Sequence, residues 1–107
     1  MNEVFAIPCV GAIVQKVIDG EKYILLQTRC KNGGGDTNGK LELPAGKIRE
    51  YEGVLTALCR EVFEETGIKI KHPKLCGIKQ WQTERNGVNA RYIVLLYKTN
   101  QFEVEVK

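Results

Sequence analysis

Histidine and closely spaced cysteines are scarce in this sequence. It contains one histidine, His72, and four cysteines that lie far apart without a Cys-x-x-Cys pair, namely Cys9, Cys30, Cys59 and Cys76. Disulfide frameworks and structural zinc sites both place their residues at short, regular spacings. We therefore expect free thiols in a reducing compartment, with Cys59 as a small core residue of a helix and His72 as an exposed residue of a turn.

Long hydrophobic runs and a strong excess of one charge are also absent. No segment approaches the roughly 18 apolar residues of a membrane span, and the amino terminus lacks a basic segment followed by a long apolar stretch. The 16 basic and 13 acidic residues give a formal net charge of +3 and are dispersed along the chain. We expect a cytoplasmic protein that binds a small anionic ligand, with neither a membrane nor a nucleic-acid polymer as partner.

The residues that are present suffice for one core. The chain has 107 residues, of which 43% are hydrophobic and 27% charged. We expect residues 1–107 to form a single globular domain that needs no disulfide and no structural metal.

The hydrophobic pattern predicts strands on both sides of a single helix, which indicates an α+β fold. Asp19-Gly20 and Asn86-Gly87 are typical of hairpin turns. Pro8 has no backbone donor, so its strand is expected at a sheet edge or a bulge. The strand-like runs are residues 5–17, 23–29, 41–43, 68–71, 75–83 and 90–97.

The helix is predicted over residues 53–66, and Gly67 follows at the position where a carboxyl-terminal helix cap is expected. Its apolar residues recur at helical spacing and are expected to face the core. These are Val54, Leu55, Leu58, Val62 and Phe63.

The same helix carries three glutamates on one narrow arc. At about 100° per residue, Glu61, Glu64 and Glu65 project in nearly the same direction. Like charges three and four residues apart destabilise a helix, and carboxylates near its carboxyl end oppose the helix dipole. A divalent cation with a preference for oxygen ligands, such as Mg²⁺ or Mn²⁺, would offset that repulsion. A solvated acidic face is the plain alternative.

The wider segment resembles the Nudix box. Residues 46–68 read GKIREYEGVLTALCREVFEETGI and match G-x5-E-x7-R-E-U-x-E-E-x-G-U, with U aliphatic, at every fixed position. The resemblance implies a Nudix fold, a mixed β-sheet in an α/β/α sandwich with the box as loop-helix-loop. The carboxyl-terminal helix of the family is expected to be missing or shortened, since the sequence stops at Lys107. Exposed sheet surface would then favour a homodimer.

The resemblance also implies a metal site. The ligands would be Glu61, Glu64 and Glu65, joined by the backbone carbonyl of Ala45. The cofactor would be Mg²⁺, with Mn²⁺ as the alternative. Glu64 is the first choice of general base, within a catalytic set of Glu64, Glu61 and Arg60. Family members also take the base from a later loop, and Glu103 and Glu105 are the candidates there, although their alternating run is more simply a strand.

Other box residues are expected to have structural roles. Arg60 resembles an orienting residue that pairs with carboxylates, and Glu52 is its expected partner. The plain alternative is a surface ion pair that contributes at most ~1 kcal/mol. Gly46 and Gly67 complete the structural set.

The implied reaction is Mg²⁺-dependent hydrolysis of a pyrophosphate bond in a nucleoside diphosphate linked to another group. A nucleoside triphosphate, oxidised or not, is the first expectation, as for a MutT-like enzyme. ADP-ribose or another nucleotide sugar is the second. The run Leu43 to Lys47 resembles ADP-ribose pyrophosphatases, but Glu84 stands where those enzymes carry a proline. A nucleotide-sensing or interaction module without catalysis is the alternative from another class.

Candidate substrate-binding residues lie outside the helix. Arg29 and Lys47 are candidates for phosphate contacts, as are Arg49 and Lys40, and Trp81 is a candidate for stacking on a base, with Tyr92 beside it. Solvated basic side chains and ordinary sheet packing are the plain alternatives.

Overall fold

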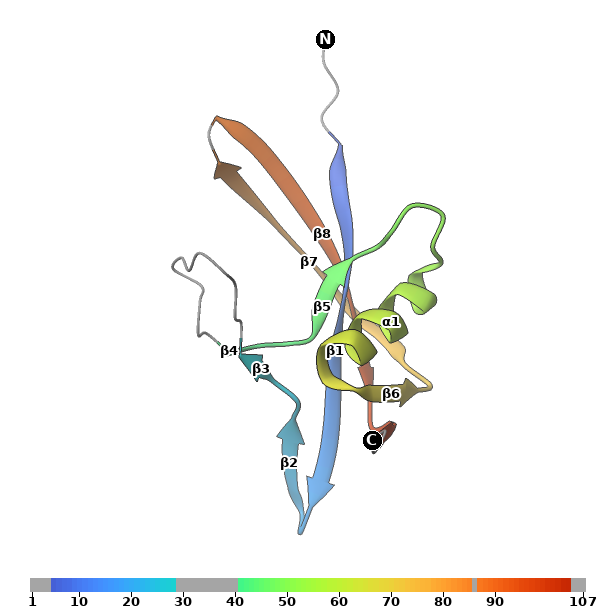
Figure 1. Cartoon of the computed structure of the whole chain (residues 1–107). Helices are drawn as coiled ribbons and strands as arrows, with labels where there is room; N and C mark the ends of the chain where they lie inside the picture. The colour runs from blue at the N-terminus through green and yellow to red at the C-terminus, as the bar shows by residue number, and fades with distance from the viewer. Residues whose placement is uncertain (1–4, 29–40, 86, 105–107) are drawn as a thin grey trace.

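The computed structural model describes residues 5–28, 41–85 and 87–104, and its main element is a five-stranded mixed sheet (Figure 1). In this sheet β2, β1, β8 and β7 lie side by side in that order, and β5 pairs with β1 off this path. β1 and β8 run parallel, whereas the other pairs are antiparallel. The strands are β1 (Ala6–Ile18), β2 (Glu21–Ile24), β5 (Ala45–Lys47), β7 (Lys74–Arg85) and β8 (Val88–Thr99).

Two small sheets and one helix complete the described part of the chain. They consist of β3 (Gln27–Thr28) with β4 (Leu41–Glu42), β6 (Ile68–Lys71) with β9 (Gln101–Val104), and helix α1 (Val54–Thr66). Strands, one helix and strands again is the predicted order, which confirms the α+β class. After β8 the described chain forms strand β9 and no further helix. Among the helices of the described residues, none is long and apolar enough to cross a membrane.

The predicted turns and helix cap are present. Asp19 and Gly20 have φ of 51° and 81°, as a tight hairpin between β1 and β2 requires, and Gly87 between β7 and β8 has φ of 76°. Gly67 has φ of 76°, and its N–H bonds the carbonyl of Phe63 at 2.8 Å. Local sequence therefore determines where these elements begin and end.

Pro8 does not lie at an edge, and that prediction was wrong. β1 is an interior strand, with β8 on one side and β2 and β5 on the other. Pro8 lies near the start of the strand, beside Ile93 of β8, and its carbonyl accepts a hydrogen bond from Ile48 N–H at 3.0 Å. Proline lacks only the donor, so an interior position is tolerated where the carbonyl makes the bond.

The core lies between α1 and one face of the large sheet. Alternate β1 residues Val10, Ala12 and Val14 are buried against the helix. The helix contributes Ala57, Leu58 and Val62, and β6 contributes Ile70.

Two predicted core residues are exposed instead. The side of α1 that carries Leu55 and Cys59 faces away from the sheet, and Leu55 is 51% exposed. The apolar arc of the helix is wider than the arc that the sheet covers, and spacing alone does not tell the two apart. Cys59 and Cys76 are exposed free thiols and Cys9 is a buried one, whereas Cys30 lies outside the described residues.

The opposite face of the sheet carries an aromatic pair. Trp81 and Tyr92 are register partners on β7 and β8, and their rings stack with centroids 5.4 Å apart. Cys9 and Val94 on this face are buried, but Trp81 remains 47% exposed.

Candidate active site

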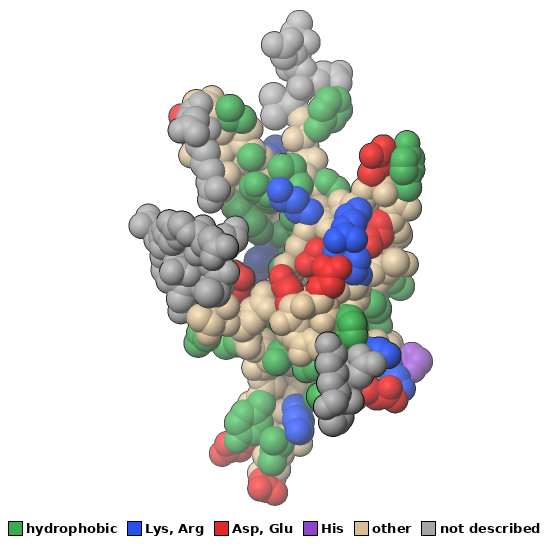
Figure 2. Space-filling view, viewed as in Figure 1, with side chains coloured by type: hydrophobic (Ala, Val, Ile, Leu, Met, Phe, Trp, Pro, Cys, Tyr) green, Lys and Arg blue, Asp and Glu red, His purple; other side chains and the backbone are tan. Residues whose placement is uncertain are grey.

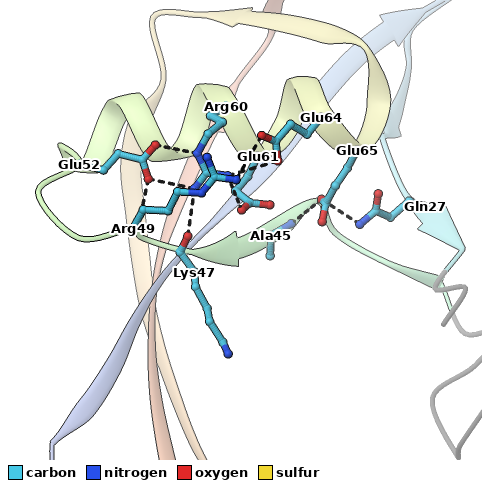
Figure 3. Close-up of polar contacts among 9 residues, drawn as sticks. All are labelled: Gln27, Ala45, Lys47, Arg49, Glu52, Arg60, Glu61, Glu64 and Glu65. Carbon is cyan, nitrogen blue, oxygen red and sulfur yellow. Dashed lines mark hydrogen bonds and ion pairs between the residues drawn. The ribbon is translucent and has the colours of Figure 1, made fainter. Parts of the chain in front are cut away.

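The three glutamates of α1 project toward β5 and the loop that follows it (Figure 3). They are not equally enclosed, since the side chain of Glu61 is 16% exposed and that of Glu64 is 48% exposed. Figure 2 shows acidic and basic side chains gathered together on this part of the surface. The shared arc predicted from helical geometry is therefore present, with one half-open and one enclosed carboxylate.

Arg60 is the centre of the polar contacts. Its Nε and Nη2 donate to the two carboxylate oxygens of Glu52 at 2.6 and 2.9 Å. Its Nη1 donates to Glu61 at 2.8 Å and to Glu64 at 3.3 Å, and its Nη2 also reaches the backbone carbonyl of Lys47 at 3.2 Å. A guanidinium has five N–H donors, and these contacts engage five acceptors.

The Arg60–Glu52 pair differs from an ordinary surface ion pair. The two side chains are only 16% and 12% exposed, and the contact is bidentate. Hydrogen bonding to Arg60 is the main reason that the pKa of Glu52 falls to about 2, and the N–H of Arg49 adds to the effect. The same contact raises the pKa of Arg60. Both groups are therefore charged at neutral pH, and they join the helix to the preceding loop.

Gly46 lets a carboxylate approach the backbone of β5. A Cβ at this position would overlap the carboxylate of Glu61, so the overlap could be relieved only by moving that group. The register Val10↔Gly46 explains the geometry, because Val10 faces the helix and Gly46 therefore does so too. The glycine of the motif is required here for close approach rather than for a special backbone angle.

Glu65 connects the helix to two strands. Its Oε2 accepts hydrogen bonds from Ala45 N–H at 3.0 Å and from Gln27 Nε2 at 2.9 Å. The pKa of Glu65 is raised, chiefly because the partly enclosed carboxylate loses hydration, while Glu61 and Glu42 add repulsion. Ionisation of Glu65 is therefore less favourable here than in water, despite the hydrogen bonds from Gln27 and Ala45, and a bound cation would offset this.

The donor chemistry of the cluster fits a divalent cation. Carboxylates from Glu61, Glu64 and Glu65 are the hard oxygen donors that such ions prefer. Close approach at Gly46 and the raised pKa of Glu65 both suit a site that gains a positive charge. Within residues 5–28, 41–85 and 87–104, no three acidic, histidine or cysteine side chains already converge as a finished metal site. Glu61 and Glu64 instead contact Arg60, whereas Glu65 contacts Gln27 and Ala45.

The other predicted site residues lie differently. Ala45 contacts Glu65 through its N–H, so the carbonyl ligand stays a prediction. Lys47 contributes its backbone carbonyl to Arg60, and its side chain points away from the glutamates in Figure 3. Trp81 lies on the opposite sheet face in the stack with Tyr92.

Several candidates have no part in the described cluster. Glu103 lies on β9 and pairs with Lys71 at 2.6 Å, as expected of a strand with an outward acidic face. Arg29, Lys40 and Glu105 lie outside the described residues.

Two contacts of the cluster were not foreseen from the sequence. Gln27 reaches Glu65 from a strand 38 residues away, and no local pattern marks a glutamine for such a contact. Arg49 lies 3.6 Å from Glu64, and its place in the box loop was the only signal.

Comparison with known proteins agrees with this geometry. The family model for the NUDIX domain matches residues 8–107. An RNA pyrophosphohydrolase of Rhizobium meliloti (strain 1021) is 37% identical over 65 residues, which is 58% of this chain and 37% of that protein. This chain thus spans well under half of that relative's length.

Two solved structures share the fold across nearly the whole chain. The MutT NUDIX hydrolase of Burkholderia pseudomallei superposes with a TM-score of 0.76 at 29% identity, over 97% of this chain and 74% of that one. A NUDIX hydrolase of Nitrosomonas europaea gives a TM-score of 0.74 at 27% identity, over 94% and 62% of the two chains. With its box residues gathered around Arg60 and the family model matched from Pro8 onward, the chain belongs to the Nudix hydrolase family.

Proposed function

We propose that this protein hydrolyses a pyrophosphate bond in a nucleoside diphosphate derivative, with Mg²⁺ held by Glu61, Glu64 and Glu65. The observation that carries the proposal is that three glutamates project from one turn of α1 toward β5, where Gly46 lets the carboxylate of Glu61 approach the strand backbone. Mn²⁺ would serve the same donor set. The carbonyl of Ala45 is the proposed fourth protein ligand.

Each residue has a distinct proposed task. A bound divalent cation would neutralise phosphoryl oxygens and acidify a coordinated water. Glu64 is half exposed, and it accepts the proton of the attacking water. Its neighbour Glu61 is fixed by Arg60 and Gly46.

Arg60 is a positioning residue in this proposal and not a reacting one. All five of its N–H donors are engaged by protein acceptors, which leaves none for a phosphate. Its task is to hold Glu61 and to anchor the helix to Glu52.

A nucleoside triphosphate is the first candidate substrate. The support is the 29% identity with a MutT NUDIX hydrolase over nearly the whole chain. Because the chain is similar to an RNA pyrophosphohydrolase, 5′-triphosphorylated RNA must be tested as a second candidate substrate. We still expect no polymer partner. ADP-ribose remains the nucleotide-sugar alternative, from the run Leu43 to Lys47.

The test is a substrate panel with product analysis. The purified chain is incubated with Mg²⁺ and, separately, with EDTA, on nucleoside triphosphates including oxidised dGTP, on 5′-triphosphorylated RNA, and on ADP-ribose and dinucleoside polyphosphates. We expect Mg²⁺-dependent release of pyrophosphate and a nucleoside monophosphate from a triphosphate. Binding of a nucleotide by folded protein without any release would favour the interaction module and contradict the enzyme.

We propose a single domain over residues 1–107, a homodimer that covers exposed sheet surface, and a cytoplasmic location. Sedimentation of the purified chain checks the second, since a monomer at micromolar concentration would contradict it.

A further inference from the structure

The two arginines beside the glutamates are held very differently. The side chain of Arg60 is 16% exposed and all its donors are engaged. The side chain of Arg49 is 64% exposed and forms an ion pair with Glu64 at 3.6 Å. Arg60 is therefore part of the framework, whereas Arg49 makes a contact that solvent and other ions can compete for.

The backbone at Arg49 is nevertheless fixed. Its N–H donates to Glu52 Oε1 at 3.0 Å, and its carbonyl accepts from Glu52 N–H at 3.1 Å. Glu52 is in turn held by Arg60. These backbone bonds do not involve the side chain of Arg49, so its contact with Glu64 can be lost while the backbone stays in place.

Glu64 is bracketed by positive charge. Its Oε1 faces Arg49 and its Oε2 faces Arg60, as the close-up shows (Figure 3). A divalent cation that approaches Oε1 meets the guanidinium of Arg49 and is repelled by it. Of the two arginines, Arg49 has the longer contact and the greater exposure, so it is the one that yields.

We propose that Arg49 is an exchangeable counter-ion of Glu64, and that its released guanidinium binds the phosphate chain of the substrate. The proposal rests on the function proposed above. In the metal-free protein Arg49 neutralises Glu64; when a divalent cation takes that carboxylate, Arg49 is free to turn toward phosphate oxygens. Guanidinium and phosphate match in charge and in bidentate geometry. The same side chain thus hinders metal binding and favours phosphate binding.

The test uses Mn²⁺ alone as the metal probe, with free Mn²⁺ followed by electron paramagnetic resonance. Arg49→Gln should bind Mn²⁺ about two- to fivefold more tightly than the native chain, the range for loss of an exposed ion pair. Lys71→Gln removes a comparable exposed pair with Glu103 and should leave Mn²⁺ affinity unchanged. The difference should shrink as salt is raised.

A second arm measures inorganic pyrophosphate binding in the presence of saturating Mn²⁺. Arg49→Gln should weaken pyrophosphate binding about fivefold. Arg49→Lys should bind pyrophosphate with an affinity between those of the native chain and Arg49→Gln, because lysine keeps the charge but cannot bind phosphate through two parallel N–H donors. Opposite signs for metal and pyrophosphate are the signature, since a purely structural role would weaken both. In a Glu64→Gln background, Arg49→Gln should no longer alter Mn²⁺ affinity.

Equal or weaker Mn²⁺ affinity in Arg49→Gln would overturn the exchange, and unchanged pyrophosphate affinity would overturn the phosphate contact. Neither readout needs turnover. A chain that shows both shifts but hydrolyses nothing on the panel would support the role of Arg49 and count against the proposed function.

Discussion

The cluster beside α1 and the outer part of the β7–β8 hairpin differ in how firmly their side chains are held. In the cluster, Arg60 and Glu52 are mostly enclosed and bonded at 2.6 and 2.9 Å. On the hairpin, Trp81 is 47% exposed and Val88 is 67% exposed. Figure 2 shows hydrophobic side chains at the surface there. The pair that joins α1 to the preceding loop is therefore enclosed and firmly held, whereas the hairpin surface, where we propose that Trp81 contacts a base, is left exposed.

Apart from replacing a glutamate of α1 itself, the largest effect is expected at Gly46, where a Cβ would overlap the Glu61 carboxylate. Gly46→Ala would force the carboxylate of Glu61 to move, and misplacement of about 1 Å can reduce a rate about a hundredfold. Gly77→Ala on β7 is the matched control, because nothing lies within 4 Å of a Cβ there. Turnover of both folded variants checks the prediction, and equal activity would show that the position of Glu61 is unimportant.

Arg60→Lys tests whether the bidentate contact matters. A lysine keeps the charge but cannot reach five acceptors, so we expect about a tenfold fall in kcat with little change in KM. The pKa of Glu52 should rise from about 2 toward the ordinary 4.5, measured by carboxyl NMR. A kcat equal to that of the native chain would show that Arg60 and Glu52 form only an ordinary ion pair without effect on the reaction.

This pair also gives a pH dependence with a definite sign. The pKa of Glu52 is lower in the folded chain than its ordinary 4.5, so its contribution to stability is complete above that value and is lost as pH falls toward about 2. Thermal unfolding of the native chain should lose stability between those pH values, and Glu52→Gln should show a flatter profile. A native profile as flat as that of the variant would contradict the pairing.

On the hairpin side, Trp81→Ala should affect recognition and not the chemical step. If a base stacks on the exposed ring, KM for a nucleoside triphosphate rises about fivefold, within the range for base stacking, while kcat is maintained. Trp81→Phe keeps a stacking surface and should lie close to the native chain. An unchanged KM in Trp81→Ala would contradict base stacking and show that the contact between Trp81 and Tyr92 only packs the sheet surface.

The smallest expected effect is a change in the unfolding temperature when Glu65 is replaced. The pKa of Glu65 is raised in the folded chain, so stability from this group falls as pH rises through that raised value. In EDTA, Glu65→Gln should therefore unfold at a slightly higher temperature than the native chain at neutral pH. Added Mg²⁺ should stabilise the native chain more than the variant, and the reverse order would contradict Glu65 as a ligand.

Short-range features were predictable from the sequence and long-range contacts were not. The hairpin at Asp19-Gly20, the cap at Gly67 and the shared arc of the glutamates follow from local backbone geometry. The Gln27–Glu65 bond joins residues 38 apart, and it depends on how β3 packs beside the helix. Exposure of Leu55 likewise depends on what covers each side of α1, which periodicity does not specify.

The site could be foreseen in its residue types but not in its charge pairing. Helical spacing placed the carboxylates together, and the resemblance to the Nudix box suggested their role. The hydrogen bond from Arg60 to the Lys47 carbonyl and the ion pair of Arg49 with Glu64 both depend on how the loop after β5 packs against α1. Sequence spacing does not specify that packing.

The most direct measurement is the initial rate of hydrolysis as a function of Mg²⁺ concentration for the native chain and for Glu64→Gln, with Glu103→Gln as the control from β9. We predict a rate that rises with Mg²⁺ and disappears in EDTA, a loss of about a hundredfold or more in Glu64→Gln, and no change in Glu103→Gln. Hydrolysis that persists in EDTA, or that survives Glu64→Gln, would contradict a metal-dependent reaction at the glutamates of α1.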